Sequence, residues 1–240
     1  MRPRRVRSLV SSVSGMSEDR RKSRFQLYLI THRHLAAASG GLIATVEEAL
    51  ASAAEIRPSC TVAIQLREKD LEARELYALA LALRPICTRF GALLIVNDRI
   101  DVAIAANADG AHLTSTSFAI ADARTLLGPS RLIGVSTHRR EELAATARDG
   151  ADFAVFGPVY DPLSKGAYGP AQGLAALADA VKAAGDMPLY ALGGINRARA
   201  AEIALLKPGS RPAGIAVIGA VFGSSAPGAA TRDLLLALIQ

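Results

Sequence analysis

The stretch Ala191-Leu192-Gly193-Gly194-Ile195 decides the fold, together with a later one, Gly214-Ile215-Ala216-Val217-Ile218-Gly219. Each contains a short apolar run, as a buried strand would, with glycine directly after the run or one residue beyond it. Glycine permits a tight turn with positive φ and leaves backbone amides bare to face an anion. Glycines after a seventh strand and amides after an eighth form the recurring phosphate site of the (β/α)8 barrel. We therefore predict such a site at the Gly193–Gly194 turn and at the Ile218–Gly219 amides.

Outward from these stretches, short apolar runs alternate with longer amphipathic stretches from Phe25 onward. Continuous apolar runs are typical of parallel strands that helices cover. Ala, Leu, Glu and Arg recur between them at helical spacing, as in Leu71–Arg89 and Arg139–Arg148. The eight runs that we expect to be strands are Phe25–Thr31, Thr61–Leu66, Ala92–Val96, Gly110–Leu113, Leu132–Ser136, Phe153–Phe156, Leu189–Leu192 and Gly214–Ile218.

Eight such units can close into a barrel or lie open as a doubly wound sheet. The number of runs favours the barrel, and so do the polar residues that follow many of them, because a barrel gathers all these loops at one face. An open sheet would concentrate them at one switch point. We predict a single TIM barrel over residues 25–240, of the phosphate-binding type.

The net charge of +6 belongs to one end of the chain. Residues 1–24 hold eight basic and two acidic side chains, so residues 25–240 are neutral overall. This argues against nucleic-acid binding by the folded part. We expect residues 1–24 to be a basic, disordered tail, and Met16 offers an alternative start.

Cysteine use and hydropathy indicate a cytoplasmic protein. Cys60 and Cys87 have neither metal-ligand spacing nor a disulfide pattern, and we expect both to be buried, inert thiols. No apolar stretch reaches the roughly 20 residues that a membrane span needs. The sequence leaves open whether the protein forms a homo-oligomer.

Cationic and amide side chains follow the second and third runs. Gln65 and Arg67 should point to one face of a strand and Leu66 to the other. Arg67 and Lys69 would then lie at the barrel mouth, where they can clamp a diphosphate; a solvated charge run is the alternative. Asn97 and Asp98 directly follow the third run. An Asp at this point can ligate Mg²⁺ or cap a helix, and the sequence does not separate the two.

Later candidates follow the fifth and sixth runs. Ser136 can bond a phosphate and His138 can act as an acid or base, although Ser136-Thr137 is also a common helix cap. The long stretch Gly157–Gly173 carries Ser164 and Lys165. Long loops in compact domains are often functional, and a loop lysine can close over a phosphate, unless Lys165 is an ordinary surface residue.

Seven motifs occur in one order and spacing and resemble the family of thiamine phosphate synthases and thiazole tautomerases. They extend from Leu27 to about Phe222 and are QLREK (Gln65–Lys69), VNDR (Val96–Arg99), GAHL (Gly110–Leu113), GVSTH (Gly134–His138), FGPV (Phe156–Val159), Ser164–Lys165 and ALGGI (Ala191–Ile195). The resemblance implies a synthase that couples 4-amino-2-methyl-5-pyrimidinylmethyl diphosphate to a thiazole phosphate and releases diphosphate.

The resemblance also implies roles for individual residues. Asp98 would bind Mg²⁺, while Gly194 and the amides near Ile218–Gly219 would hold the thiazole phosphate. The residues implied to hold the pyrimidine diphosphate are Arg67, Lys69, Asn97, Ser136 and Lys165. Because Mg²⁺, Arg and Lys can stabilise a departing diphosphate, the chemistry needs no side-chain nucleophile.

The chain departs from the family's pattern at three places. Ser117 stands where synthases carry a second Mg²⁺-binding carboxylate, which predicts weaker Mg²⁺ binding. His32 follows Thr31 where Asp is common, and Pro162 replaces a usual Thr. The Ser-rich stretch at Ser117 resembles the metal-independent tautomerase branch, whose catalytic His matches His138. The intact Arg67 and Asp98 motifs favour the synthase.

Three alternatives belong to other functional classes. One is a non-catalytic relative that binds thiamine intermediates, which the missing carboxylate suggests. A second is a nucleic-acid binder that uses the basic tail, which the neutral body disfavours. A third is another phosphate-binding barrel such as an aldolase, which the paired cation and amide clusters disfavour.

Overall fold

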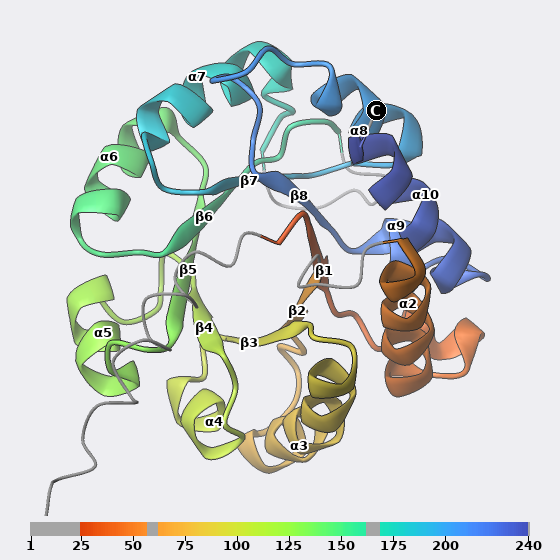
Figure 1. Ribbon diagram of the computed structural model, residues 1–240. Coiled ribbons are helices and arrows are strands. Elements are labelled where there is room, and N and C mark those ends of the chain that lie inside the picture. The colour runs from red at the N-terminus through yellow and green to blue at the C-terminus, as the bar shows by residue number, and fades with distance from the viewer. Residues whose placement is uncertain (1–24, 57–61, 162–168, 240) are drawn as a thin grey trace, which may run out of the picture.

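The computed structural model describes residues 25–56, 62–161 and 169–239. These residues form a closed barrel of eight parallel strands that lie in sequence order (Figure 1). β1 closes the barrel, since Leu27 is paired with Val62 on one side and Ile215 on the other. The strands are β1 (Leu27–Ile30), β2 (Val62–Leu66), β3 (Leu93–Asn97), β4 (Gly110–Leu113), β5 (Leu132–Thr137), β6 (Phe153–Phe156), β7 (Leu189–Leu192) and β8 (Gly214–Val217).

The closed order confirms the predicted barrel and excludes the doubly wound sheet. All eight expected runs contain a strand, and their ends differ from the predicted ones by two residues at most. The predicted tail over residues 1–24 lies outside the described residues, as do Cys60, Ser164 and Lys165.

Helices form a ring outside the strands (Figure 1). The two stretches predicted from helical spacing are confirmed, with starts at Ala73 and Arg140. The helices are α2 (Leu42–Ile56), α3 (Ala73–Arg89), α4 (Ile100–Ala105), α5 (Ile120–Leu127), α6 (Arg140–Arg148), α7 (Gly173–Ala184), α8 (Arg197–Ala204), α9 (Gly219–Phe222) and α10 (Pro227–Ile239), with a short 3-10 helix η1 (Ala36–Ser39). In the described part of the chain no helix is long and apolar enough to cross a membrane.

The core has two parts because successive strand residues face opposite sides of the sheet. One part lies between the sheet and the helices and includes Leu66 and Cys87. Cys87 is buried, as predicted, and burial raises the pKa of its thiol to about 12. The other part fills the barrel, where the ring of Phe25 stacks on Tyr190 at 4.2 Å between centroids. A packed interior leaves the ends of the barrel as the places where a ligand can bind.

Two carboxylates hold the amino-terminal ends of the strands, and we name these contacts the floor clamps. Asp109, just before β4, accepts hydrogen bonds from the amide of Leu94 at 2.8 Å and from the guanidinium of Arg84 at 2.6 Å. Asp152, just before β6, accepts one from the amide of Ile133 at 2.7 Å and another from the guanidinium of Arg124. Each clamp ties a helix to two neighbouring strands at the end of the barrel opposite the post-strand loops.

Candidate active site

Every predicted site residue within the described chain lies at the carboxyl-terminal end of a strand or among the residues that directly follow it. Because all eight strands are parallel, these ends form one face of the barrel, which we call the mouth. The residues concerned are Gln65, Arg67 and Lys69 at β2, Asn97 and Asp98 at β3, Ser136 and His138 at β5, Gly193 and Gly194 at β7, and Ile218 and Gly219 at β8. Ser164 and Lys165 fall outside the described residues.

The end of β2 is fixed by the end of β1. The amide of Arg67 donates to Thr31 Oγ1 at 2.8 Å, and the amide of Thr31 donates to the carbonyl of Gln65 at 2.9 Å. Gln65 is buried, with 2% exposed, while Lys69 is exposed. Gln65 points into the barrel, where its side chain bonds Tyr28, and Leu66 packs under the helices. The predicted alternation of these two residues is therefore confirmed.

A hydrogen-bonded line of side chains crosses the barrel interior below the mouth, and we name it the polar chain. The Tyr28 hydroxyl lies 3.3 Å from His112 Nδ1 and also bonds the side chain of Gln65. His112 Nε2 lies 2.9 Å from Ser136 Oγ. The polar chain therefore links two predicted site residues, Gln65 and Ser136, through two that sequence reasoning missed.

His112, the central residue of the polar chain, has a defined protonation state, and a glycine on the neighbouring strand leaves space for its ring. Burial, and then the charge of Arg67, lowers the pKa of His112 to about 3, so the imidazole is neutral near pH 7. Gly134 is paired with His112 on the neighbouring strand, and a Cβ there would lie 2.7 Å from His112 Nδ1. The glycine of GVSTH thus makes room for the ring of Phe153, 2.2 Å from that Cβ, and for the histidine of GAHL. The signal available in the sequence for His112 was a polar residue inside the short run Gly110–Leu113.

Asp98 and Ser117 meet at the mouth. Ser117 Oγ donates to Asp98 Oδ1 at 2.5 Å. Asp98 has φ of 63°, and Arg99 holds the N-cap position of α4, so the helix-cap interpretation of Asp98 was wrong. Within the described residues no three His, Cys, Asp or Glu side chains gather as metal ligands. Among the described residues, this contact joins the Asp98 carboxylate to the Ser117 hydroxyl, and Thr114 Oγ1 lies 3.1 Å from Ser117 Oγ.

The residues after β5 do not cap the next helix with Ser136 or Thr137. Arg139 holds the N-cap position of α6, and Thr137 Oγ1 donates to the carbonyl of Val155 at 3.0 Å. The interpretation of Ser136-Thr137 as a helix cap was therefore also wrong, because β5 continues through Thr137. His138 Nδ1 lies 2.8 Å from the carbonyl oxygen of Gly157, which fixes the exposed ring against the loop after β6.

The glycine turn after β7 lies against the loop after β6. Gly193 and Gly194 have φ of 107° and 61°, so both adopt backbone conformations that favour glycine. A Cβ on Gly193 would lie 2.7 Å from Pro158 Cα, and one on Gly194 would lie 2.5 Å from the carbonyl oxygen of Asp161. Arg199 donates to the carbonyl of Gly194 at 2.5 Å, an anchor that sequence reasoning missed. The turn therefore needs glycine both for its conformation and for its close packing.

The residues after β8 open directly into α9. Ile218 is the N-cap residue of α9, and Gly219 is its first residue. Gly219 is exposed, and a Cβ there would have no atom within 4 Å. Backbone amides at a helix start in open space can face an anion.

Comparisons with known proteins agree on one family. Residues 27–221 match the family described as thiamine monophosphate synthase. A Geobacter sulfurreducens protein is 48% identical over 89% of this chain and 94% of its own length. The thiamine-phosphate synthase of Roseiflexus castenholzii is 41% identical over 87% of this chain and 86% of its own.

A solved structure points to the same family. The thiamine phosphate pyrophosphorylase from Pyrococcus furiosus superposes with a TM-score of 0.75 and 30% identity, over 91% of this chain and 97% of that one. The family match spans β1 to α9, which includes every described strand and the whole mouth. The chain belongs to the thiamine monophosphate synthase family.

Proposed function

We propose that this protein is a thiamine-phosphate synthase, a transferase that joins a pyrimidinylmethyl diphosphate to a thiazole phosphate. The observation that carries the proposal is the placement of two kinds of anion-binding group at one mouth. Arg67 and Lys69 follow β2, and the Gly193–Gly194 turn follows β7. The family membership of the chain supports the same activity.

In this proposal the cations and amides after β2, β3 and β5 hold the diphosphate. Arg67 binds it through a planar guanidinium fork, and Lys69 adds a point charge. Asn97 and Ser136 supply neutral hydrogen bonds, and the polar chain holds Ser136 in place. Lys165 and Ser164 remain predicted ligands. As the diphosphate leaves, these groups stabilise the negative charge that develops on it.

The second substrate binds at the part of the mouth formed by the ends of β7 and β8. The Gly193–Gly194 turn and the Ile218–Gly219 amides hold the thiazole phosphate, because backbone amides at a glycine turn and at a helix start can bind anions. Anchoring the phosphate places the thiazole nitrogen against the reacting carbon of the pyrimidine. The carbon–oxygen bond to diphosphate breaks, and the carbon–nitrogen bond forms, without a covalent intermediate on the protein.

The donor set at Asp98 fits Mg²⁺ in a limited way. Mg²⁺ commonly binds through one or two carboxylates and completes its shell with water and substrate phosphate oxygens. Asp98 supplies one carboxylate, and Ser117, which donates to it at 2.5 Å, adds a neutral hydroxyl. Bound there, Mg²⁺ would neutralise part of the diphosphate charge.

The direct test is an assay of purified protein with Mg²⁺ and both substrates, in which thiamine phosphate and diphosphate are measured. The proposal predicts equal amounts of both products. Isomerisation of the thiazole phosphate alone would identify a tautomerase, the alternative that Ser117 supports. Binding of the substrates without either reaction would identify a non-catalytic relative.

The Ser117–Asp98 contact leads to a prediction about the metal. Replacing Ser117 by Asp puts a second carboxylate beside Asp98, which we expect to tighten Mg²⁺ binding by roughly tenfold, or about 1.4 kcal/mol. Synthase activity at limiting Mg²⁺ should rise with it. Isothermal titration with Mg²⁺ measures the affinity, and Ser117→Asn is a neutral control. Unchanged affinity in Ser117→Asp would contradict a metal site at Asp98.

The polar chain leads to a second prediction. Tyr28→Phe removes the hydroxyl that bonds His112 and Gln65, and we expect kcat to fall about fivefold, because one buried hydrogen bond contributes about 1 kcal/mol. Tyr190→Phe is the matched control, because it removes an equally buried hydroxyl beside Tyr28, one that donates to the carbonyl of Phe25 at 3.1 Å. Both variants should lose similar stability in a urea titration, and only Tyr28→Phe should lose kcat. Equal kcat in the two variants would exclude a role for the polar chain.

A further inference from the structure

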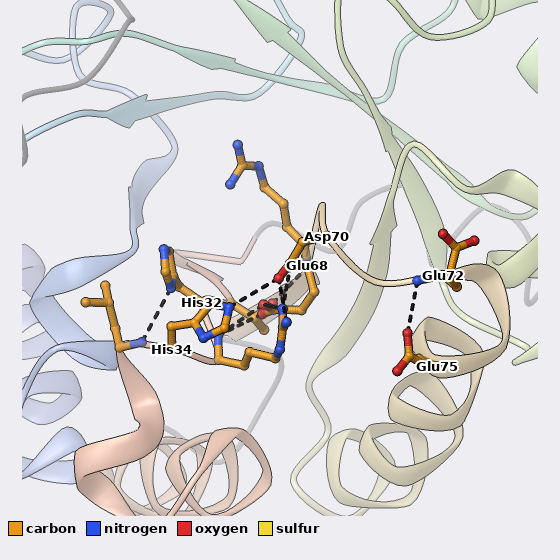
Figure 2. Close-up of polar contacts among 10 residues, drawn as sticks. His32, His34, Glu68, Asp70, Glu72 and Glu75 are labelled. Carbon is orange, nitrogen blue, oxygen red and sulfur yellow. Dashed lines mark hydrogen bonds and ion pairs between the residues drawn. The ribbon is translucent and has the colours of Figure 1, made fainter.

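Two carboxylates of the loop after β2 are bound by the loop after β1 (Figure 2). The amide of Arg33 donates to both oxygens of Glu68, at 3.0 and 3.1 Å, and its guanidinium donates to Glu68 Oε2 at 3.3 Å. The same guanidinium binds both oxygens of Asp70, and His34 Nε2 lies 3.2 Å from Asp70 Oδ2. We name these contacts the β1–β2 lock.

Burial shows that Glu68 is the inner member of the lock. Its side chain is 3% exposed, against 26% for Arg33 and 55% for Asp70. A buried carboxylate is stable only when its oxygens receive hydrogen bonds, and here Arg33 donates three of them. Hydrogen bonds from Arg33, and then from His34, hold the pKa of Asp70 well below its usual range, so Asp70 stays ionised near pH 7.

The lock acts on the residues beside Glu68. On one side the amide of Arg67 is held by Thr31 Oγ1 at 2.8 Å. On the other side the carbonyl of Glu68 accepts the amide of Leu71 at 3.3 Å in a turn that contains Lys69. The backbone between Arg67 and Lys69 is therefore tied to the loop after β1 at two points, the Arg67 amide and the Glu68 side chain.

The lock also keeps the carboxylates of Glu68 and Asp70 paired with Arg33. Glu68 and Asp70 flank Lys69 in the sequence, and Glu68 follows Arg67 directly. Arg33 takes up both carboxylates on the β1 side. Opposite charges that are already paired compete less for the neighbouring cations. Glu72 and Glu75 do not belong to the lock, because they pair with each other at the start of α3, the Glu72 amide donating to Glu75 Oε2 at 3.2 Å (Figure 2).

We propose that Glu68 and Arg33 are positioning residues, which hold the loop after β2 so that Arg67 and Lys69 face a diphosphate at the mouth. This inference rests on the proposed function. It adds two residues that contact each other rather than the substrate. A displacement of about 1 Å in a clamp can cost up to about 100-fold in rate, so loosening the lock should weaken the grip on the diphosphate specifically.

The test compares Glu68→Gln with Asp109→Asn. The two substitutions remove similar contacts, a carboxylate that accepts a backbone amide and an arginine, but Asp109 belongs to a floor clamp at the far end of the barrel. We expect Glu68→Gln to raise KM for the pyrimidine diphosphate by roughly tenfold or more and to leave KM for the thiazole phosphate unchanged. Asp109→Asn should lower the melting temperature and leave both KM values unchanged. Arg33→Lys, which keeps the backbone amide contact and a positive charge, should fall between wild type and Glu68→Gln, and it provides the same test if Glu68→Gln does not fold.

A second measurement separates the inference from the proposed function. Inorganic pyrophosphate with Mg²⁺ is titrated into wild type and the variants by calorimetry, with no coupling reaction required. We expect Glu68→Gln to bind it at least tenfold more weakly than wild type and Asp109→Asn to match wild type. Wild type that binds pyrophosphate but forms no thiamine phosphate would contradict the proposed function alone. A folded Glu68→Gln or Arg33→Lys variant with wild-type pyrophosphate affinity, or with equal increases in both KM values, would overturn the positioning role.

Discussion

Arg67→Ala should lower kcat/KM for the pyrimidine diphosphate by about 10²–10³-fold, a loss typical for removing one group that stabilises charge in a transition state. The guanidinium is the largest donor surface at the end of β2, and its amide is fixed by Thr31. Arg67 is also close enough to contribute to the lowered pKa of His112. Steady-state rates of diphosphate release with both substrates measure the effect.

Two further variants make the Arg67 result specific. Arg67→Lys keeps the charge and loses the planar fork, so we expect an intermediate rate. Arg89→Ala removes an arginine that pairs with Glu47 on the outer helices, and it should leave the rate unchanged. If Arg67→Ala were as active as Arg89→Ala, the diphosphate would have to bind elsewhere.

Gly193→Ala should destabilise the protein by about 3 kcal/mol or more, because it combines backbone strain with a clash in a packed site. The φ of 107° is unfavourable for any residue with a Cβ, and that Cβ would lie 2.7 Å from both Pro158 Cα and Pro158 Cβ. Relief of the clash would shift the turn that is proposed to hold the thiazole phosphate. KM for that substrate should therefore rise along with the loss of stability in a urea titration.

Gly209→Ala is the matched control for Gly193→Ala. Gly209 has φ of 80°, but a Cβ there would have no atom within 4 Å, so strain alone should cost about 1 kcal/mol. Its KM values should match those of wild type. Equal destabilisation by the two substitutions would show that the loop after β6 does not restrain the glycine turn.

The fold could be predicted from the sequence because its main determinant is local. Each strand is a short apolar run, and the spacing of the runs follows from the helices between them, so a single pass along the chain finds all eight. The rule that parallel strands present their following loops at one face then places Arg67, Asp98 and Ser136 at the mouth. The ends of the strands were less predictable, and β5 extends to Thr137 because this residue still pairs with Phe156 of β6.

The contacts inside the site could not be predicted, because they join residues that are distant in sequence. Tyr28 and His112 are 84 positions apart, and Arg33 and Glu68 are 35 apart. Glu68 looks like one member of a solvated charge run until the loop after β1 is placed beside it. The helix-cap alternatives for Asp98 and Ser136 failed for the same reason, since both side chains bind partners on a neighbouring strand or its following loop. The roles of Ser164 and Lys165 stay predictions.

The floor clamps divide the consequences of mutation between the two ends of the barrel. Damage to Asp109 or Asp152 weakens the fold as a whole, so a stabilising substitution anywhere in the chain can restore it. Damage to the residues at the mouth, whether or not it also lowers stability as in Gly193→Ala, changes the geometry of the site, and added stability does not repair that geometry. Loops at the mouth can therefore change in sequence or length while the clamped end keeps the barrel closed. A library of variants that leaves Asp109 and Asp152 unchanged should retain the largest share of folded proteins.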